Sequence, residues 1–298
     1  MATDFPSVDD APGRAPVGEH VPRRSQTAHW LVAIGAIVWR DIAFSVRRCR
    51  GLIANVLIST VLLVAVTGGF DGFRRALTEP YGTYVAFSNY LLPGLIGLIS
   101  LLAGSRAAGS LVAGRGAGSL QFFLVAPLPR WIGLFAKLLA VALLVVAQAV
   151  IFLLAASLID VDVDFVPWLA AAPAVMLGVF MITAVSFALL VFLRAANRRS
   201  TATLYGAILV FFLSTALYPI WRFSDAEADY LAVIVAANPF THVVELIRFA
   251  SEGQLAVASL VVVVGVSALA FALAVIGIDP KRNPHHLLRT GWQPAEVD

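Results

Sequence analysis

The sequence predicts an all-α integral membrane protein with six transmembrane helices, an N-terminal interfacial helix and a re-entrant helical hairpin before the last span. Of its 298 residues, 60% are hydrophobic and 13% are charged, whereas about 25% are charged in a typical soluble domain. Apolar stretches of the roughly 20 residues that cross a bilayer recur along the chain. This composition excludes a soluble globular protein of this size, which would need more polar surface.

The chain divides into a long membrane domain between two polar tails. Residues 1–28 contain four prolines and charges of both signs, which is typical of a disordered cytoplasmic tail and not of a signal peptide. Residues 29–280 are the predicted transmembrane permease domain, and residues 281–298 a cytoplasmic C-terminal tail. Cys49 is the single cysteine, so no internal disulfide is expected.

The stretch before the first predicted span favours a helix that lies on the membrane surface. Its apolar run, residues 30–39, is too short to cross a bilayer, and Arg40 and Asp41 end this run. Arg47, Arg48 and Arg50 would lie near anionic headgroups. A seventh span is the alternative, but a central charge pair is costly in lipid.

Six apolar stretches are long enough to span the membrane. They cover Leu52–Phe70, Thr83–Ala103, Trp131–Ile159, Val166–Leu193, Thr201–Trp221 and Leu255–Ile278. With the N-terminus inside, every Lys and Arg falls on an inner segment except Arg74, Arg75, Arg222 and Arg248. Basic residues concentrate on the cytoplasmic side of membrane proteins. We therefore expect a multi-pass protein of a bacterial-type cytoplasmic (inner) membrane, with both termini cytoplasmic.

The composition of the predicted span interiors bears on which classes of membrane protein this chain could be. Their middles contain no Asp, Glu, Lys, Arg or His. An ion-coupled secondary transporter or channel usually holds an ionisable residue at depth, and a membrane-embedded enzyme needs acids, bases or metal ligands. Both stay open as alternatives, as does an assembly factor, but the spans do not favour them. We expect no catalytic residue and no metal site.

The chain also has no recognisable site for ATP. A phosphate-binding loop needs a Gly-rich turn and a lysine followed by Ser or Thr. The two lysines lie in "LFAKLLA" and "DPKRNP", and neither context qualifies. The net charge of +3 is small, and we expect no nucleic-acid partner.

A polar interruption, "GRGAGSLQFFLVAPLPRW" (residues 114–131), follows the second predicted span on the inner side. It is too polar for lipid and too apolar for an ordinary loop. Residues 105–125 could form a helix along the inner surface, because the first proline of the stretch comes only at Pro127. A plain connector is the alternative.

Three segments resemble type-2 ABC transporter permeases. "RGAGSLQFFLVAPLPRWIGLFAK" (residues 115–137) is similar to the family's cytoplasmic loop and third-span entry. "YLLPGLIGL" (90–98) looks like its second span, and "NPFTHVVELIR" (238–248) like the Asn-Pro segment before its last span. The resemblance covers about residues 28–280, in the same order.

The resemblance implies a transporter assembled from several chains. Two permease subunits, the second expected to be a copy of this chain, would form one pore with two separate ABC ATPase subunits. ATP and Mg would bind those ATPases, with no cofactor in this chain, and membrane lipids would surround it. The interfacial helix and the loop at 105–126 would dock on the ATPases. The candidate coupling residues are Arg40, Asp41, Arg106, Arg115, Ser119 and Gln121.

The segment from Ser224 to Gln254 predicts two short helices in the outer leaflet. Asn238 and Pro239 separate two apolar pieces, each half a span long, and Asn-Pro is a turn signal. Glu245 and Arg248, at i and i+3, could pair. In the family resembled, such a re-entrant hairpin lines the outer gate. A surface hairpin with a solvated ion pair is the alternative.

The resulting hypothesis is the membrane-spanning permease subunit of an ATP-driven ABC exporter. A separate ATPase would drive alternating access and move the substrate out of the cytoplasm. Because the span interiors contain no charge, we expect a hydrophobic or amphipathic substrate, of which a lipid-linked molecule is one example.

Overall fold

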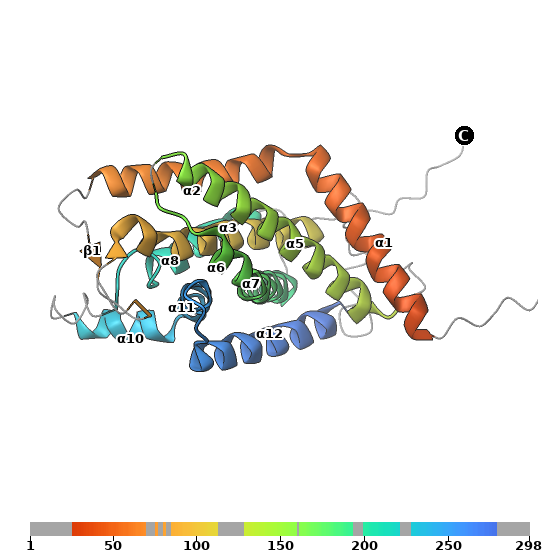
Figure 1. Cartoon of the computed structure of the whole chain (residues 1–298). Coiled ribbons are helices and arrows are strands. Elements are labelled where there is room, and N and C mark those ends of the chain that lie inside the picture. Colours follow the sequence, from red (N-terminus) through yellow and green to blue (C-terminus); the bar gives the residue numbers. More distant parts are fainter. Residues whose placement is uncertain are drawn as a thin grey trace, which may run out of the picture.

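The computed structural model describes residues 26–69, 75–76, 80–81, 85–112, 128–159, 161–192, 199–220 and 228–278. These residues form a bundle of helices (Figure 1), with one two-residue antiparallel pair between β1 and β2. The elements in chain order are α1 (Gln26–Arg47), α2 (Arg50–Gly69), β1 (Arg75–Ala76), β2 (Val85–Ala86), α3 (Phe87–Val112), α5 (Arg130–Ser157), α6 (Phe165–Ala170), α7 (Ala172–Phe192), α8 (Arg199–Phe212), α10 (Asp229–Ala237), α11 (Pro239–Ser251) and α12 (Val257–Gly277).

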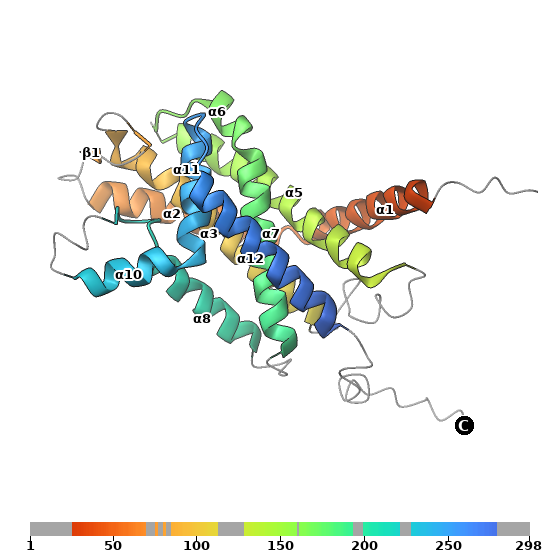
Figure 2. The same cartoon turned by 90° about the horizontal axis from the view of Figure 1, so that it is seen from below.

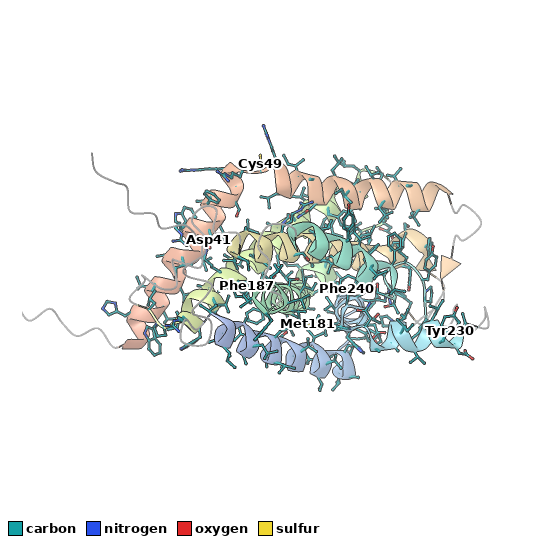
Figure 3. The ribbon with its side chains drawn as sticks, turned by 180° about the vertical axis from the view of Figure 1, so that it is seen from behind. Asp41, Cys49, Met181, Phe187, Tyr230 and Phe240 are labelled. Atoms are coloured by element: carbon teal, nitrogen blue, oxygen red, sulfur yellow. The ribbon has the colours of Figure 1, made fainter. Side chains whose placement is uncertain are left out.

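The core is built around α3, which packs against α2, α5, α7, α8 and α11. Its Tyr90, Ile96 and Ile99 side chains are fully buried. On its other side α7 packs against α12, which Figure 2 shows running across the face of the bundle. The interior side chains labelled in Figure 3, such as Phe187 and Phe240, are almost wholly removed from the surface.

The expectation of an all-helical protein with six membrane-crossing helices is confirmed. Among the described residues, six helices are long and apolar enough to cross a bilayer: α1, α2, α3, α5, α7 and α12. The set differs from the predicted one, because α1 belongs to it by length and composition. The position of α1 on the membrane surface therefore stays a prediction. The tails at 1–25 and 279–298 lie outside the described residues.

The main correction concerns the predicted span Thr201–Trp221, which does not form one continuous helix. Its helix, α8, has 14 residues and ends at Phe212, and the chain continues in turns as far as Ile220. The Ser214 hydroxyl donates to the Phe211 carbonyl at 2.6 Å and accepts from the Ala216 amide at 3.2 Å. A serine that bonds the local backbone in this way competes with the helix ladder. Pro219 also disfavours helix in the residue before it.

A smaller correction concerns the predicted span Val166–Leu193. It forms two helices, α6 and α7, which are interrupted at Ala171. Asp164 caps α6 by accepting a hydrogen bond from the Val166 amide at 3.2 Å. Pro173 is the second residue of α7, in the first turn, where its missing amide is harmless.

The predicted pair of short helices before the last span is α10 and α11. They meet at Asn238 with a bend of 76°. Tyr230 and Val233 of α10 are largely exposed, whereas α11 packs against α3, α7 and α12. The bent pair matches a broken span or a re-entrant loop, and the re-entrant placement stays a prediction.

Candidate functional site

Two polar clusters join helices that are distant in sequence, and both include α3. One contains Arg106 near the end of α3, and the other contains Tyr90 near its start. These residues are about 24 Å apart along the axis, at about 1.5 Å of rise per residue. In the predicted topology the Arg106 cluster faces the cytoplasm and the Tyr90 cluster faces outward.

An ion pair fixes α1 to α5 beside the first cluster. The Lys137 Nζ atom lies 2.8 Å from Asp41 Oδ2, and Arg40 Nη2 lies 2.9 Å from Asp41 Oδ1. The Lys137 side chain is only 5% exposed. A second contact holds the start of both helices, where the rings of Trp30 and Trp131 meet edge to face at 6.0 Å. Because a buried ammonium needs a partner such as a carboxylate, the bond between Asp41 and Lys137 stabilises the packing of α1 on α5.

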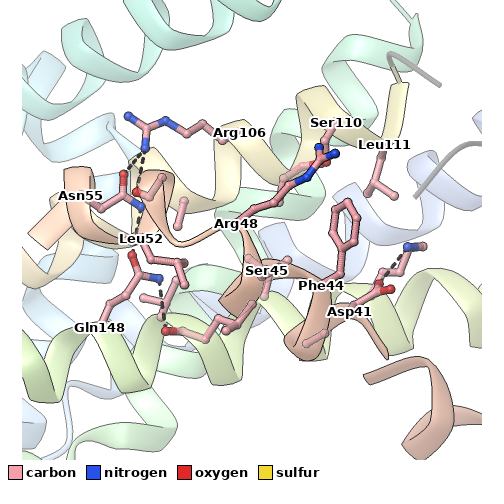
Figure 4. A pocket seen from close by; sticks show the side chains of 18 residues that line it. Asp41, Phe44, Ser45, Arg48, Leu52, Asn55, Arg106, Ser110, Leu111 and Gln148 are labelled. Atoms are coloured by element: carbon pink, nitrogen blue, oxygen red, sulfur yellow. Dashed lines mark hydrogen bonds and ion pairs between the residues drawn. The ribbon is translucent and has the colours of Figure 1, made fainter. Parts of the chain in front are cut away.

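Arg106 begins a hydrogen-bond chain that crosses three helices (Figure 4). Its Nη1 donates to the Gly51 carbonyl at 3.1 Å and to the side-chain oxygen of Asn55. The Asn55 amide donates to Gln148 at 3.0 Å, and the Gln148 amide donates to the Leu144 carbonyl at 3.1 Å. Asn55 and Gln148 are both 2% exposed. These bonds hold α2, α3 and α5 together at one level of the bundle.

The ion pair and the Arg106 chain border one cavity of about 290 Å³ between α1, α2, α3 and α5. Asp41, Arg48, Arg106 and Lys137 supply its charged lining, and Asn55, among others, supplies uncharged polar groups. The rest of the wall is mainly apolar.

The structure thus brings three of the predicted coupling residues close together. Asp41 and Arg106 line the cavity, and Arg40 bonds to Asp41. Arg115, Ser119 and Gln121 lie outside the described residues, so their role stays a prediction.

The sequence did not identify the partners that Asp41 and Arg106 have in the structure. These are Lys137 for Asp41, and Asn55 with Gln148 beyond it for Arg106. The available signal was that a lone polar side chain in an apolar helix usually faces a partner on another helix.

In the outer cluster, a buried arginine binds a backbone carbonyl. Arg248 of α11 is 3% exposed, and its Nη2 donates to the Thr215 carbonyl at 3.0 Å. The Tyr90 hydroxyl donates to the same carbonyl at 3.0 Å. The guanidinium also stacks over the Tyr90 ring, 4.2 Å from its centroid, which is a favourable cation–π contact. The Thr215 carbonyl can accept these bonds because α8 has already ended.

Tyr81 lies close to this cluster, outside the spans. Burial raises the pKa of Tyr81 to about 12, and the positive charge of Arg248 opposes this shift in part. The phenol is therefore neutral at physiological pH and adds no counter-charge for Arg248.

The predicted ion pair between Glu245 and Arg248 does not form. Glu245 accepts a hydrogen bond from Ser259 of α12 at 2.7 Å and lies 3.7 Å from the His242 ring nitrogen. Arg248 is turned instead toward α3 and the end of α8, where it meets Thr215 and Tyr90. The i,i+3 spacing allows a pair, but α11 is packed with these two side chains directed at different neighbours.

Asn238 and Pro239 set the geometry of the α10–α11 bend. Asn238 caps α11 by accepting from the Phe240 amide at 3.0 Å, and Pro239 occupies the first turn. The Asn238 amide also donates to the carbonyls of Val210 at 2.8 Å and Leu213 at 2.6 Å. One side chain therefore begins α11 and satisfies carbonyls at the end of α8.

Residues 73–276 match the family model described as ABC-2 family transporter protein. The chain belongs to the ABC-2 transporter family. The match confirms the predicted resemblance and makes this ABC-2 permease a multi-pass membrane subunit of an ABC transporter, which is not itself catalytic. The family implies association with an ABC ATPase subunit. No curated protein matches the sequence.

Breaking the α1–α5 ion pair should destabilise the permease. Asp41→Ala removes the carboxylate that neutralises buried Lys137, which should lower the free energy of unfolding by about 3 kcal/mol. Thermal unfolding of the purified chain in detergent measures the loss. The second change Lys137→Met should restore most of it, and Asp162→Ala, at an exposed carboxylate, is the matched control. Equal stability of Asp41→Ala and Asp162→Ala would show that the pair contributes nothing.

Exchanging the charges of Glu245 and Arg248 should harm the permease. In the double variant Glu245→Arg, Arg248→Glu, the carboxylate at 248 would face the Thr215 carbonyl and the electron-rich face of Tyr90. The free energy of unfolding should fall by about 3 kcal/mol or more. Glu245→Gln should be tolerated, because its amide oxygen can still accept from Ser259. The amount of folded protein in membranes and its unfolding temperature measure both effects, and a swapped variant as stable as wild type contradicts the separate partners.

Proposed function

We propose that this chain is the membrane subunit of an ATP-driven exporter. It moves a hydrophobic or amphipathic substrate, of which a lipid-linked molecule is one example, out of the cytoplasm by alternating access. The match of residues 73–276 to the ABC-2 family carries this proposal. A second copy of the chain completes the pore, and two ATPase subunits bind ATP and Mg.

The substrate class is supported by an apolar groove of about 470 Å³ between α3, α7, α8 and α11. Leu101, Met181, Val210 and Phe240 are among its lining residues, and none of the described residues that line it is ionisable. Ligand pockets of this size are typical of small molecules and are largely apolar. An uncharged wall favours the apolar part of a cargo over an inorganic ion.

The coupling route is supported by the way α1 is held. The ion pair to Lys137 and the Trp30–Trp131 contact join α1 to the first half of α5, while Arg106 ties α3 to α2. An ATPase that pushes α1 would therefore displace α5 with it. We expect the segment around Arg115, Ser119 and Gln121 to be the second docking point. On the outer side, Asn238, Pro239 and Arg248 form the gate that must open, and Glu245 links α11 to α12.

Purification of the native complex tests the exporter. The chain alone should neither bind nor hydrolyse ATP, whereas an ABC ATPase should co-purify with it, and the complex should hydrolyse ATP and transport. Arg115→Glu should reduce transport several-fold without changing membrane insertion, because it reverses a charge at the docking surface. Arg289→Glu, in the predicted C-terminal tail, is the matched control. Transport by the chain alone, driven by an ion gradient, would instead identify a secondary transporter.

The proposed orientation can be tested at Cys49. This cysteine is exposed at the corner between α1 and α2 (Figure 3) and is the single cysteine of the chain. A membrane-impermeant maleimide should not label it in intact cells and should label it after permeabilisation. In a Cys49→Ser background, Asp229→Cys at the exposed start of α10 should label in intact cells. Labelling of Cys49 without permeabilisation contradicts a cytoplasmic N-terminus.

A further inference from the structure

The cavity between α1, α2, α3 and α5 has an excess of positive charge (Figure 4). Among the residues that the structure describes, its charged lining consists of three cations, Arg48, Arg106 and Lys137, and one carboxylate, Asp41. That carboxylate already bonds to Lys137 at 2.8 Å and to Arg40 at 2.9 Å. Arg48 and Arg106 form no ion pair with any carboxylate in the part of the chain that the structure describes.

Both arginines keep hydrogen-bond donors for a ligand. Arg106 uses Nη1 to bond Gly51 and Asn55, which fixes the guanidinium at the cavity wall. Arg48 lies in the turn between α1 and α2, with its guanidinium 4.8 Å from the centroid of the Phe44 ring. A guanidinium has five N–H donors in a planar fork, a geometry that matches phosphate oxygens.

The apolar part of the wall points to a lipid. Leu52, Val141 and Leu144 line the cavity together with the two guanidinium groups. The volume of about 290 Å³ is at the lower limit for a pocket that encloses a small molecule, so it suits a headgroup better than a whole lipid. The cavity also lies beside the first turn of α2, where Arg50 begins the helix. Arginines at the end of a span extend to the level of the lipid phosphates.

We propose that this cavity binds the phosphate-bearing headgroup of an anionic membrane lipid. Arg48 and Arg106 hold the phosphate, and the wall formed by Leu52, Val141 and Leu144 contacts the first carbons of the acyl chains. The bound headgroup bridges the α1–α2 corner to α3. This site differs from the apolar groove proposed for the substrate. The proposed orientation places the site in the cytoplasmic leaflet, where anionic lipids attract basic segments. Only this choice of leaflet depends on the orientation.

Lipid binding to the full-length chain in detergent micelles tests the site. Phosphatidylglycerol should raise the unfolding temperature at concentrations about tenfold lower than phosphatidylcholine does. Arg48→Gln and Arg106→Gln should each weaken phosphatidylglycerol binding about tenfold, the loss expected for one charged hydrogen bond. Arg47→Gln is the matched control, because Arg47 is an exposed arginine of the same corner that does not line the cavity. It should change the binding less than about twofold, because its side chain does not line the cavity.

Three results would overturn the proposal. Equal binding of phosphatidylglycerol and zwitterionic phosphatidylcholine would show that the net negative charge of the headgroup is not recognised. An equal loss in Arg47→Gln and Arg48→Gln would indicate diffuse attraction to the basic corner. Stabilisation by inorganic phosphate at the concentration effective for phosphatidylglycerol would identify free phosphate as the ligand. Arg48→Gln decides the case if Arg106→Gln fails to fold, because the Arg48 side chain bonds to no described side chain. The assay uses no ATPase and no transport, so the exporter is tested separately.

Discussion

The structure depends on one constraint, which is that backbone polar groups inside a bilayer must find partners within the protein. The constraint is sharpest where α8 stops at Phe212 and leaves carbonyls without helical partners. Asn238 donates to the carbonyls of Val210 and Leu213, and Arg248 and Tyr90 donate to that of Thr215. The break is tolerated because α3, α11 and the junction between α10 and α11 supply these donors.

Apolar length predicted the fold class, but it could not predict this break. The run Thr201–Trp221 has the hydropathy of a span, and its interruption is stabilised by side chains far away in sequence. Asn238 is 25 residues from Leu213, and Arg248 is 33 residues from Thr215. The local signals, Ser214 and Pro219, are too common in membrane helices to decide the matter alone. The chain after α8 also packs closely on α3, where a Cβ at Gly94 would clash with the Ala216 backbone. Hydropathy does not reveal such a close approach.

The candidate site was predictable by residue type and not by pairing. Arg40, Asp41 and Arg106 were predicted as coupling residues because they lie in the segments that the resemblance places against the ATPases. A partner such as Lys137, 96 residues after Asp41, depends on how whole helices pack. The Glu245–Arg248 pair failed for the opposite reason. Its spacing was correct, yet α11 packs against α3 with Arg248 turned inward, where Tyr90 and the Thr215 carbonyl are its partners.

The two clusters share α3, and they differ in how firmly they hold. At the Arg106 end, carboxamides and a buried ion pair join α1, α2, α3 and α5, so these helices should move together. At the Tyr90 end, Arg248 faces a neutral carbonyl and an aromatic ring, and it pairs with no carboxylate among the described residues. A charged group bound to a neutral acceptor is held less strongly than an ion pair in the same surroundings. The alternating access that we propose needs a rigid part that transmits force and a contact that can open. In that proposal, the difference in partners gives these roles to opposite ends of α3.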